Sequence, residues 1–430
     1  RGALDVRATE ITEGMKMAAT KALAALAKEP VPDEVAAAYA GEQMQFGPEY
    51  LIPKPFDARV LIWEASAVAQ AAVDEGMARI SAKDFDINKY REDLEARLGL
   101  TRSIMRHVIN QARKERKKIV FSEGEEPTII KAASQCLVEG ICDPILLGHP
   151  ERIEAVKEEL GLTFDCEVID VRYDPRRRGD YADELHKLRG RKGLTRRDAI
   201  NQLKSPNYFG PMMVHCGDAD GYLGGIAHNY PDIVKPCLQT IGPDPSSHRI
   251  VGLYMMTVNG QLMFIADATI NIYPDARTLA EIAIQTAKVA RRFGVTPKVA
   301  MLSFSNFGTS NELRTDRIEE AIAMARELDR GLVIDGPMQA DTALVPDRQN
   351  EFPFMEFDGP ANVLVCPNLA SANIAYKLLQ RVAGAEMTGP ILEGLSKPAH
   401  VLQRGDSVRQ VVHMAAITAV DAQRHAKQRL

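Results

Sequence analysis

Apolar residues in the first part of the chain recur at the spacing of amphipathic helices. From Met15 to Leu26 they form one face of a first helix, and an alanine-rich stretch over residues 65–77 predicts a second. Residues 81–118 are densely charged but keep apolar residues at helical spacing. The pattern therefore predicts a mostly helical segment ahead of the rest of the chain.

After residue 118 the pattern changes to short apolar runs separated by amphipathic stretches. The runs lie at residues 119–121, 145–147, 262–267, 299–304, 332–335 and 363–366. Uninterrupted apolar strands are typical of parallel sheets covered on both faces, and their alternation with helices predicts an α/β fold. A segment rich in chain breakers, residues 241–247, predicts a boundary between two lobes.

The composition and net charge of the chain argue against some classes of binding partner. The chain has 430 residues, 45% apolar and 26% charged, and a net charge of -5, so we expect neither nucleic acid nor an anionic membrane as a partner. The basic stretch at residues 172–197 is interrupted by acidic residues and carries few aromatics, which predicts an exposed arm with ion pairs. No apolar run is long enough to cross a bilayer and no signal peptide is recognisable, so we expect a cytoplasmic protein.

The sequence offers no pattern for metal or dinucleotide binding. Its six cysteines show neither C-x-x-C spacing nor zinc-finger spacing with histidine, so we interpret them as reduced thiols. No G-x-G-x-x-G fingerprint follows a predicted strand. We therefore expect no metal site and no nicotinamide cofactor within this chain.

Two stretches carry candidate binding chemistry. Arg404 and Gly405 stand just before a predicted helix that Asp406 or Ser407 can cap. This arrangement suits an anion, because the helix amides and the guanidinium both favour negative charge. A loop of small polar residues follows the run at residues 299–304, at the strand end where ligands bind in open parallel sheets. A surface arginine and a polar turn are the simpler interpretations of these residues.

The residues around both stretches resemble the phosphotransacetylase family. Similar to its C-terminal signature are Gly-Pro-Ile-Leu at 389–392, Gly-Leu-x-Lys-Pro at 394–398 and Leu-x-Arg-Gly-x-Ser-Val at 402–408. Further matches are MLSFSNFG at 301–308, IDGPMQ at 334–339 and NVLVCPNLASANIAYKLLQR at 362–381. The resemblance implies two three-layer αβα lobes with mainly parallel sheets and an acyl-CoA cleft between them. The first lobe would comprise residues 103–242 and 389–430, and the second residues 243–388.

The chain departs from the family at two positions that bear on catalysis. The family motif reads Leu-Ser-Arg-Gly, with an aspartate six residues after the arginine, whereas this chain has Gln403 and Gln410 in those places. In the family the serine and arginine are thought to steady acetyl phosphate, and the aspartate to deprotonate the thiol of coenzyme A. Glutamine does not ionise and cannot be a general base. Asp406, four residues before Gln410, leaves a displaced base as an open alternative.

The N-terminal residues resemble a different family. RGALDVRAT at 1–9 and FGPEYLIPKPFD at 46–57 are similar to the C-terminal end of bacterial malic enzymes, over about residues 1–80. Residues 81–102 would then be a helical linker. The resemblance implies the C-terminal part of a multimodular NADP-dependent malic enzyme. NADP and a divalent cation, Mg or Mn, would bind in the missing upstream module together with malate.

Together the two resemblances imply an acetyl-CoA-binding regulatory and oligomerisation domain of a malic enzyme, without transferase activity. Its partners would be acetyl-CoA, the upstream module and further copies of the chain, as a dimer or a hexamer. An active phosphate acetyltransferase and a purely structural platform stay open as alternatives. The residues expected to contact acetyl-CoA are Arg404, Ser303, Ser305, Asn306, Gly308, Thr309, Ser310, His228, Lys235, Asn368, Tyr376 and Lys397.

Overall fold

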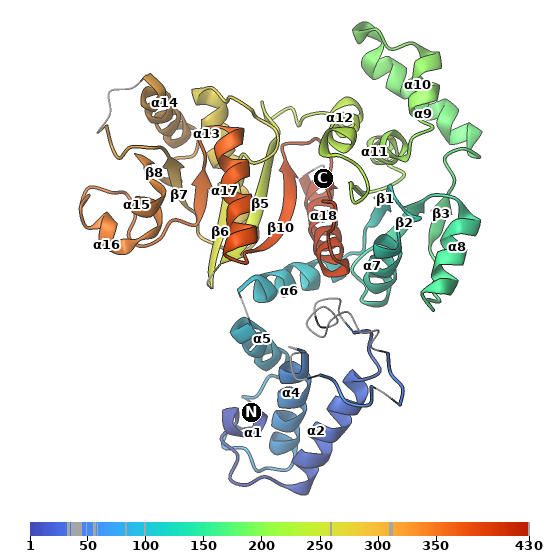
Figure 1. Ribbon diagram of the computed structural model, residues 1–430, viewed down its shortest axis with the longest axis vertical. Helices are drawn as coiled ribbons and strands as arrows, with labels where there is room; N and C mark the ends of the chain where they lie inside the picture. The colour runs from blue at the N-terminus through green and yellow to red at the C-terminus, as the bar shows by residue number, and fades with distance from the viewer. Residues whose placement is uncertain are drawn as a thin grey trace. The chain divides into compact units, whose positions relative to one another are not determined.

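The fold is given by a computed structural model (Figure 1). It describes residues 1–31, 35, 45–48, 50–54, 57, 59–81, 84–98, 100–258, 260–308 and 313–428. The chain divides into two compact units, Arg1–Arg106 and His107–Leu430. Each unit has its own core, and each is described by itself.

The first unit is helical, as the apolar spacing predicts. Its helices are α1 (Gly2–Asp5), α2 (Glu13–Leu26), α4 (Arg59–Asp74) and α5 (Ile87–Leu98), and α6 (Leu100–Arg113) continues into the second unit. Thr12 caps α2, since its side chain accepts a hydrogen bond from the Met15 amide at 3.1 Å. A side chain at Gly2 would lie 2.1 Å from the Ala65 carbonyl, so glycine lets α1 rest on the backbone of α4.

The second unit begins with a sheet of five parallel strands in the order β11-β4-β1-β2-β3. The strands are β1 (Lys118–Phe121), β2 (Asp143–Leu147), β3 (Glu167–Ile169), β4 (Gly221–Gly224) and β11 (Ala399–Val401). The helices of this lobe are α7 (Pro127–Val138), α8 (Pro150–Glu159), α9 (Pro175–Arg189), the 3₁₀ turn η1 (Gly190–Lys192), α10 (Arg196–Gln202), α11 (Pro206–Cys216), α12 (Tyr230–Thr240) and α18 (Val408–Gln428).

Alternating side chains of β1 explain why both faces of this sheet are covered. Val120 packs in one core cluster with Tyr181 of α9 and Phe209 of α11. Ile119 points to the other face, where it lies close to Gly221 and Thr418 of α18. Figure 1 shows α18 beside α7 on that face. The continuous apolar run of β1 is therefore what a strand between two helical layers requires.

The other lobe of the second unit contains a six-stranded sheet in the order β10-β5-β6-β9-β7-β8. The strands are β5 (Val251–Val258), β6 (Gln261–Ala266), β7 (Lys298–Leu302), β8 (Val333–Met338), β9 (Val363–Val365) and β10 (Glu386–Glu393). The helices are α13 (Ala276–Arg292), α14 (Leu313–Leu328), α15 (Ala340–Leu344), α16 (Pro346–Gln349) and α17 (Leu369–Val382). In β6, Ile265 faces the cluster that includes Tyr376 of α17, whereas Phe264 stacks on Phe293, just beyond α13.

Two lobes with mainly parallel sheets and helices on both faces confirm the predicted α/β architecture. The apolar pattern did not predict the short strands β3, β4 and β11 of the first sheet. It also did not predict β5 and β10, which form the antiparallel pairs of the second sheet together with β6. The expected lobe boundary at Gly389 falls inside β10, because Leu392 and Glu393 still pair with Gly252 and Val251 of β5. No helix in the described ranges combines the length and apolar character needed to span a bilayer.

Candidate ligand-binding site

Glu123, directly after β1, organises the loop that follows β4. Its buried carboxylate accepts hydrogen bonds from the backbone amides of Gly225 at 2.7 Å, Ile226 at 3.3 Å and Ala227 at 3.0 Å. Parallel strands end at the same sheet edge, so β1 and β4 bring these groups together. Three amides and a buried carboxylate hold the loop in one conformation.

His228 is fixed by the same carboxylate. Its Nδ1 lies 2.8 Å from Glu123 Oε1, and the histidine side chain is 45% exposed whereas that of Glu123 is 5% exposed. Because the carboxylate only accepts hydrogen bonds, Nδ1 carries the hydrogen and Nε2 is the nitrogen that remains for a proton or a ligand. Sequence reasoning selected His228 but missed Glu123. The acidic turn after the first strand was the signal that could have identified it.

Arg404 reaches the same loop from the neighbouring strand. It lies in the turn after β11, its side chain is exposed, and its Nη2 donates a hydrogen bond to the Ala227 carbonyl at 3.2 Å. Gly225 lets the two loops approach: it has a φ of +124°, and a side chain there would lie 2.6 Å from the Leu402 carbonyl. The structure thus brings together Arg404 and His228, which are far apart in the sequence.

Gln403 and Gln410 serve as links between elements. Gln410 Oε1 accepts from the Ser407 amide at 2.9 Å, and Ser407 Oγ accepts from the Gln410 amide at 3.4 Å. This reciprocal pair is a capping box at the start of α18. The two side-chain amides also donate to β10, from Gln403 to the Gly389 carbonyl at 3.2 Å and from Gln410 to the Met387 carbonyl at 3.4 Å.

Asp406 is the carboxylate in this turn. Its Oδ2 accepts a hydrogen bond from the Gln403 amide at 2.8 Å. Burial raises the pKa of Asp406 to about 6, although the Gln403 hydrogen bond acts in the opposite direction. Ser407 is therefore the residue that caps α18, and Asp406 holds the preceding turn.

A second group of selected residues lies at the carboxyl ends of β7 and β8. The Ser303 amide donates to the Met338 carbonyl at 2.8 Å. Asn306 pairs with Gln339, whose amide donates to Asn306 Oδ1 at 2.8 Å. Ser305 Oγ is buried without a hydrogen-bond partner in the described part of the chain. Gly308 has a φ of +79° in this turn, and Thr309 and Ser310 lie outside the described residues.

The remaining selected residues are spread over other parts of the second unit. Asn368 caps α17 by accepting from the Ser371 amide at 2.9 Å, and buried Tyr376 packs against Tyr254 with ring centroids 4.4 Å apart. Lys235 is exposed on α12.

Lys397 lies at the opposite sheet edge, before β11 rather than after it. Its ammonium donates to the carbonyls of Val214 at 2.6 Å and His215 at 2.8 Å, at the end of α11. The structure therefore does not bring Lys397 to Arg404 and His228.

Asp267, which sequence reasoning did not select, shapes the loop after β6. It accepts hydrogen bonds from the amides of Thr269 at 2.9 Å, Ile270 at 3.1 Å and Asn271 at 2.9 Å. Burial raises the pKa of Asp267, and these hydrogen bonds limit the rise. An aspartate two residues before a threonine at a strand end is a turn signal. This loop meets the first lobe, because Tyr230 of α12 donates to Thr269 Oγ1 at 2.7 Å.

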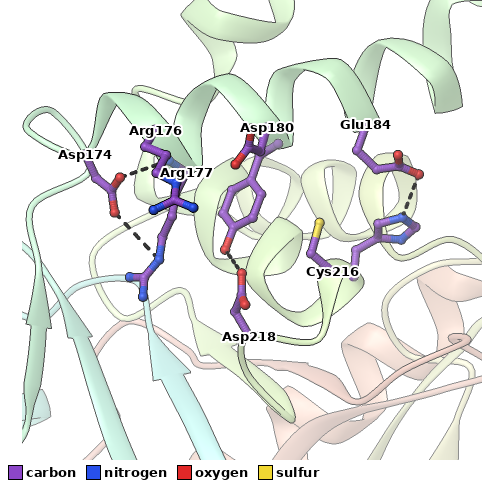
Figure 2. Close-up of a pocket in the computed structure, with 9 residues that line it drawn as sticks. Asp174, Arg176, Arg177, Asp180, Glu184, Cys216 and Asp218 are labelled. Carbon is purple, nitrogen blue, oxygen red and sulfur yellow. Dashed lines mark hydrogen bonds and ion pairs between the residues drawn. The ribbon is translucent and has the colours of Figure 1, made fainter.

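A separate surface pocket of about 840 Å³ lies between α9 and the turn that follows α11. Several of its charged and polar groups pair with one another: Asp174 with Arg177 (Figure 2), Tyr181 with Asp218, and Glu184 with His215. Burial raises the pKa of the Cys216 thiol in this pocket to about 11, so it is protonated at neutral pH. Mostly paired polar groups and an unreactive thiol make this pocket a weaker candidate than the Arg404–His228 region.

No group of three or more His, Cys, Asp or Glu side chains in the described ranges is arranged to hold a metal ion.

Comparisons with known proteins identify relatives for both parts of the chain. The family described as "Phosphate acetyl/butaryl transferase" matches residues 103–419. The phosphate acetyltransferase of Corynebacterium glutamicum is 38% identical over 73% of this chain and 96% of its own length. A phosphotransacetylase crystal structure from Streptococcus pyogenes superposes with a TM-score of 0.72 at 36% identity, covering 75% of this chain and 99% of that one.

Longer relatives match nearly the whole chain. The NADP-dependent malic enzyme of Salmonella typhimurium is 39% identical over 98% of this chain but only 56% of its own length. The chain therefore spans about half the length of such relatives.

Proposed function

The chain belongs to the phosphate acetyl/butaryl transferase family, and from that premise we propose that it is the acetyl-CoA-binding regulatory part of a malic enzyme, without transferase activity of its own. The main support for the proposal is that two side chains near Arg404 in the sequence are uncharged and hydrogen-bonded to the backbone. Gln403 and Gln410 are neutral and engaged in hydrogen bonds to backbone groups, while Arg404 is exposed beside His228.

Loss of transferase activity follows from proton chemistry. Transfer of an acetyl group to a thiol requires a base to remove the thiol proton, and an amide cannot do so. Gln410 would also have to leave the capping box and its contact with β10 before it could approach a ligand. Binding does not need this step, because Arg404 can still donate charge-assisted hydrogen bonds to a phosphate or a thioester carbonyl.

The link to malate metabolism rests on the longer relatives. Proteins named NADP-dependent malic enzyme align with nearly all of this chain, and they extend well beyond it. In the proposed parent protein, the upstream module would oxidise and decarboxylate malate with NADP and Mg or Mn. Acetyl-CoA is made from the pyruvate product, so inhibition by acetyl-CoA would be feedback. For that to work, acetyl-CoA must bind the inhibited state more tightly than the active one.

A role in oligomerisation is supported by an exposed apolar stripe on α17. Ile374, Leu378 and Val382 follow one another at four-residue spacing and are 59%, 56% and 82% exposed. Residues at this spacing share one helix face, and contiguous exposed apolar faces mark interaction surfaces. We propose that the chain forms at least a dimer through this lobe, with a hexamer as the larger alternative.

An active phosphate acetyltransferase is the second candidate, and one observation favours it. Asp406 lies in the turn that carries Arg404, and its pKa of about 6 suits proton transfer near neutral pH better than that of an ordinary aspartate. In this alternative Asp406 replaces the family base. A structural platform without a ligand is the third candidate.

Calorimetry and a transferase assay together distinguish the three candidates. Binding of acetyl-CoA without formation of acetyl-CoA from acetyl phosphate and coenzyme A supports the regulatory proposal. Turnover supports the second candidate. Absence of both binding and turnover supports the third. Arg404→Ala should weaken acetyl-CoA binding by roughly ten- to a hundredfold, because a charge-assisted hydrogen bond contributes about 1.5–3 kcal/mol. Arg381→Ala, which removes an exposed arginine from α17, is the control. Equal affinity in the two variants would place the ligand elsewhere.

A further inference from the structure

We propose that Gln423 couples the turn that carries Arg404 to the end of α6, the helix that runs from the first unit into the second. Both ends of this coupling lie on α18, because the turn stands directly before its first residues and Gln423 lies near its last. The coupling is a property of the chain without a ligand. Its use in regulation rests on the proposed function.

The side chain of Gln423 caps the C-terminal end of α6. It is 2% exposed, and its amide nitrogen donates hydrogen bonds to the carbonyls of Gln111 at 3.1 Å, Ala112 at 2.9 Å and Glu115 at 2.8 Å. The last carbonyls of an α-helix lack the regular amide partner four residues further on. A buried helix end therefore needs donors from elsewhere in the chain, and α18 supplies them here.

Glutamine suits this position because it both donates and accepts. Its Oε1 accepts a hydrogen bond from Nε2 of Gln111 at 3.2 Å. A lysine could donate to the carbonyls, but it would bury a charge and could not accept. An apolar side chain would leave buried carbonyls without a donor. Removal of the Gln423 amide should therefore loosen the end of α6.

A second attachment of α6 is more exposed. Arg113 Nε donates to the Glu139 carbonyl at 2.7 Å, and Arg113 Nη2 lies 2.8 Å from the Glu139 carboxylate. The two side chains are 42% and 32% exposed, and ion pairs at such positions contribute little. We expect the buried cap from α18 to hold the end of α6 more firmly.

The helix between the turn and the cap is firmly packed. Ala415 and Ala419 are fully buried, and α18 contacts α7 and β4. At a rise of about 1.5 Å per residue, Gln423 lies about 22 Å along the helix from its first residue. The other end is attached to β10 through Gln403 and Gln410. A packed helix shifts as one body, so a displacement of the turn reaches the cap.

Hydrogen exchange of the 430-residue chain tests the coupling without a ligand, as a double-mutant cycle. Gln423→Met should speed exchange of the last-turn amides of α6 about tenfold, because it removes buried hydrogen bonds. Gln410→Ala, which detaches the first turn of α18 from β10, should also speed exchange there. In the Gln423→Met background the effect of Gln410→Ala should be smaller by about twofold or more. Equal effects in both backgrounds would overturn the coupling.

Controls separate the cap from general stability. Gln261→Met, which replaces an exposed glutamine at the start of β6, should leave exchange of α6 unchanged. The amides of β7 and β9 in the other lobe are the internal reference. If Gln423→Met speeds exchange of these strands by the same factor as α6, Gln423 only stabilises the whole fold and the proposal is wrong. Where Gln423→Met does not fold, Gln423→Asn, which keeps the amide on a shorter side chain, should act in the same direction.

Acetyl-CoA connects the coupling to the proposed function. At saturation it should slow exchange at the end of α6 in the wild type but not in Gln423→Met, because a ligand that binds the ordered turn also stabilises what is coupled to it. Equal slowing in both proteins would refute transmission through Gln423. If calorimetry detects no acetyl-CoA binding, the proposed function fails, and the double-mutant cycle still decides the coupling.

Discussion

Arg292 is expected to be the side chain whose removal most weakens the connection between the two lobes. It ends α13 in the second lobe, and its guanidinium is paired with Glu393 of β10 and with Asp421 of α18. The side chains of Arg292 and Asp421 are each 12% exposed, and that of Glu393 is 23% exposed. One cation thus neutralises two mostly buried carboxylates from different elements.

His400 completes this cluster. Its Nδ1 accepts a hydrogen bond from the Leu392 amide at 3.1 Å, so Nε2 must carry the hydrogen that points to Asp421 at 3.1 Å. Burial opposes ionisation of Asp421, but the charge of Arg292 and the hydrogen bond from His400 outweigh it. The pKa of Asp421 therefore lies well below its usual value.

Arg292→Met should destabilise the protein by about 3–5 kcal/mol at pH 7, the usual cost of leaving a buried charge unpaired. Thermal or urea unfolding monitored by circular dichroism measures this loss. The neighbouring Arg291→Met is a matched control, because Arg291 is 39% exposed and its ion pair with Asp329 should contribute less than about 1 kcal/mol. Equal destabilisation by the two substitutions would refute the reasoning.

The lowered pKa of Asp421 also makes the stability of the protein depend on pH. In the wild type, the lowered pKa of Asp421 contributes stability above the unfolded value near pH 4. This contribution is lost as pH falls toward the folded value. In Arg292→Met the carboxylates keep only the half-exposed Arg424, whose Nη1 lies 3.8 Å from Asp421 Oδ1, so acid relieves much of their repulsion. The difference in stability between the two proteins should shrink between pH 7 and pH 4, and a constant difference would contradict the ionic origin.

Substitutions around the site, and assays of activity and mass, should have the following outcomes. Ser407→Ala should cost about 1 kcal/mol in urea unfolding, because it removes half of the capping box of α18. Gly225→Ala should lower the melting temperature by several degrees, since a methyl group would lie 2.6 Å from the Leu402 carbonyl, whereas Gly242→Ala, with open space, should do less. The chain should produce no NADPH from malate, a result that an NADPH absorbance assay on protein free of the longer enzyme can contradict. Light scattering should give at least twice the monomer mass of 47.4 kDa, and Leu378→Lys should reduce it if α17 forms the interface.

The alternation of apolar runs and helices was sufficient to predict two layered α/β lobes. The same pattern did not predict β3, β4, β5, β10 or β11. Of these, β5 pairs with the adjacent β6, whereas β10 depends on a partner distant in the sequence. Gly389 and Pro390 suggest a turn to a local analysis, yet they lie within β10. β10 pairs with β5, more than a hundred residues earlier, and the register shifts between Thr388 and Ile391. Local propensity yields to tertiary context in such a strand.

The sequence predicted which residues belong to the candidate site better than it predicted which groups they contact. Arg404 and His228 were selected from their loops, and the structure shows that Ala227 lies between them. Lys397 has the charge that a phosphate-binding lysine would have, but its ammonium donates hydrogen bonds to the carbonyls at the C-terminal end of α11. The local sequence does not tell a cation at the site, such as Arg404, from one that binds a helix end, such as Lys397. The position of each depends on which end of β11 it lies at, and that follows from the tertiary fold.

The two glutamines, which stand where the resemblance implies a serine and an aspartate, both make hydrogen bonds that hold the turn between β11 and α18. A carboxylate at position 410 could accept from Ser407 but could not donate to the Met387 carbonyl, whereas the amide of Gln410 does both. Gln403 likewise donates to Gly389, so the turn between β11 and α18 is attached to β10 at two points. Because β10 belongs to the second sheet and α18 covers the first, this turn joins the two lobes. A ligand held by Arg404 would therefore act on the connection between lobes, which is where a regulatory ligand needs to exert its free energy.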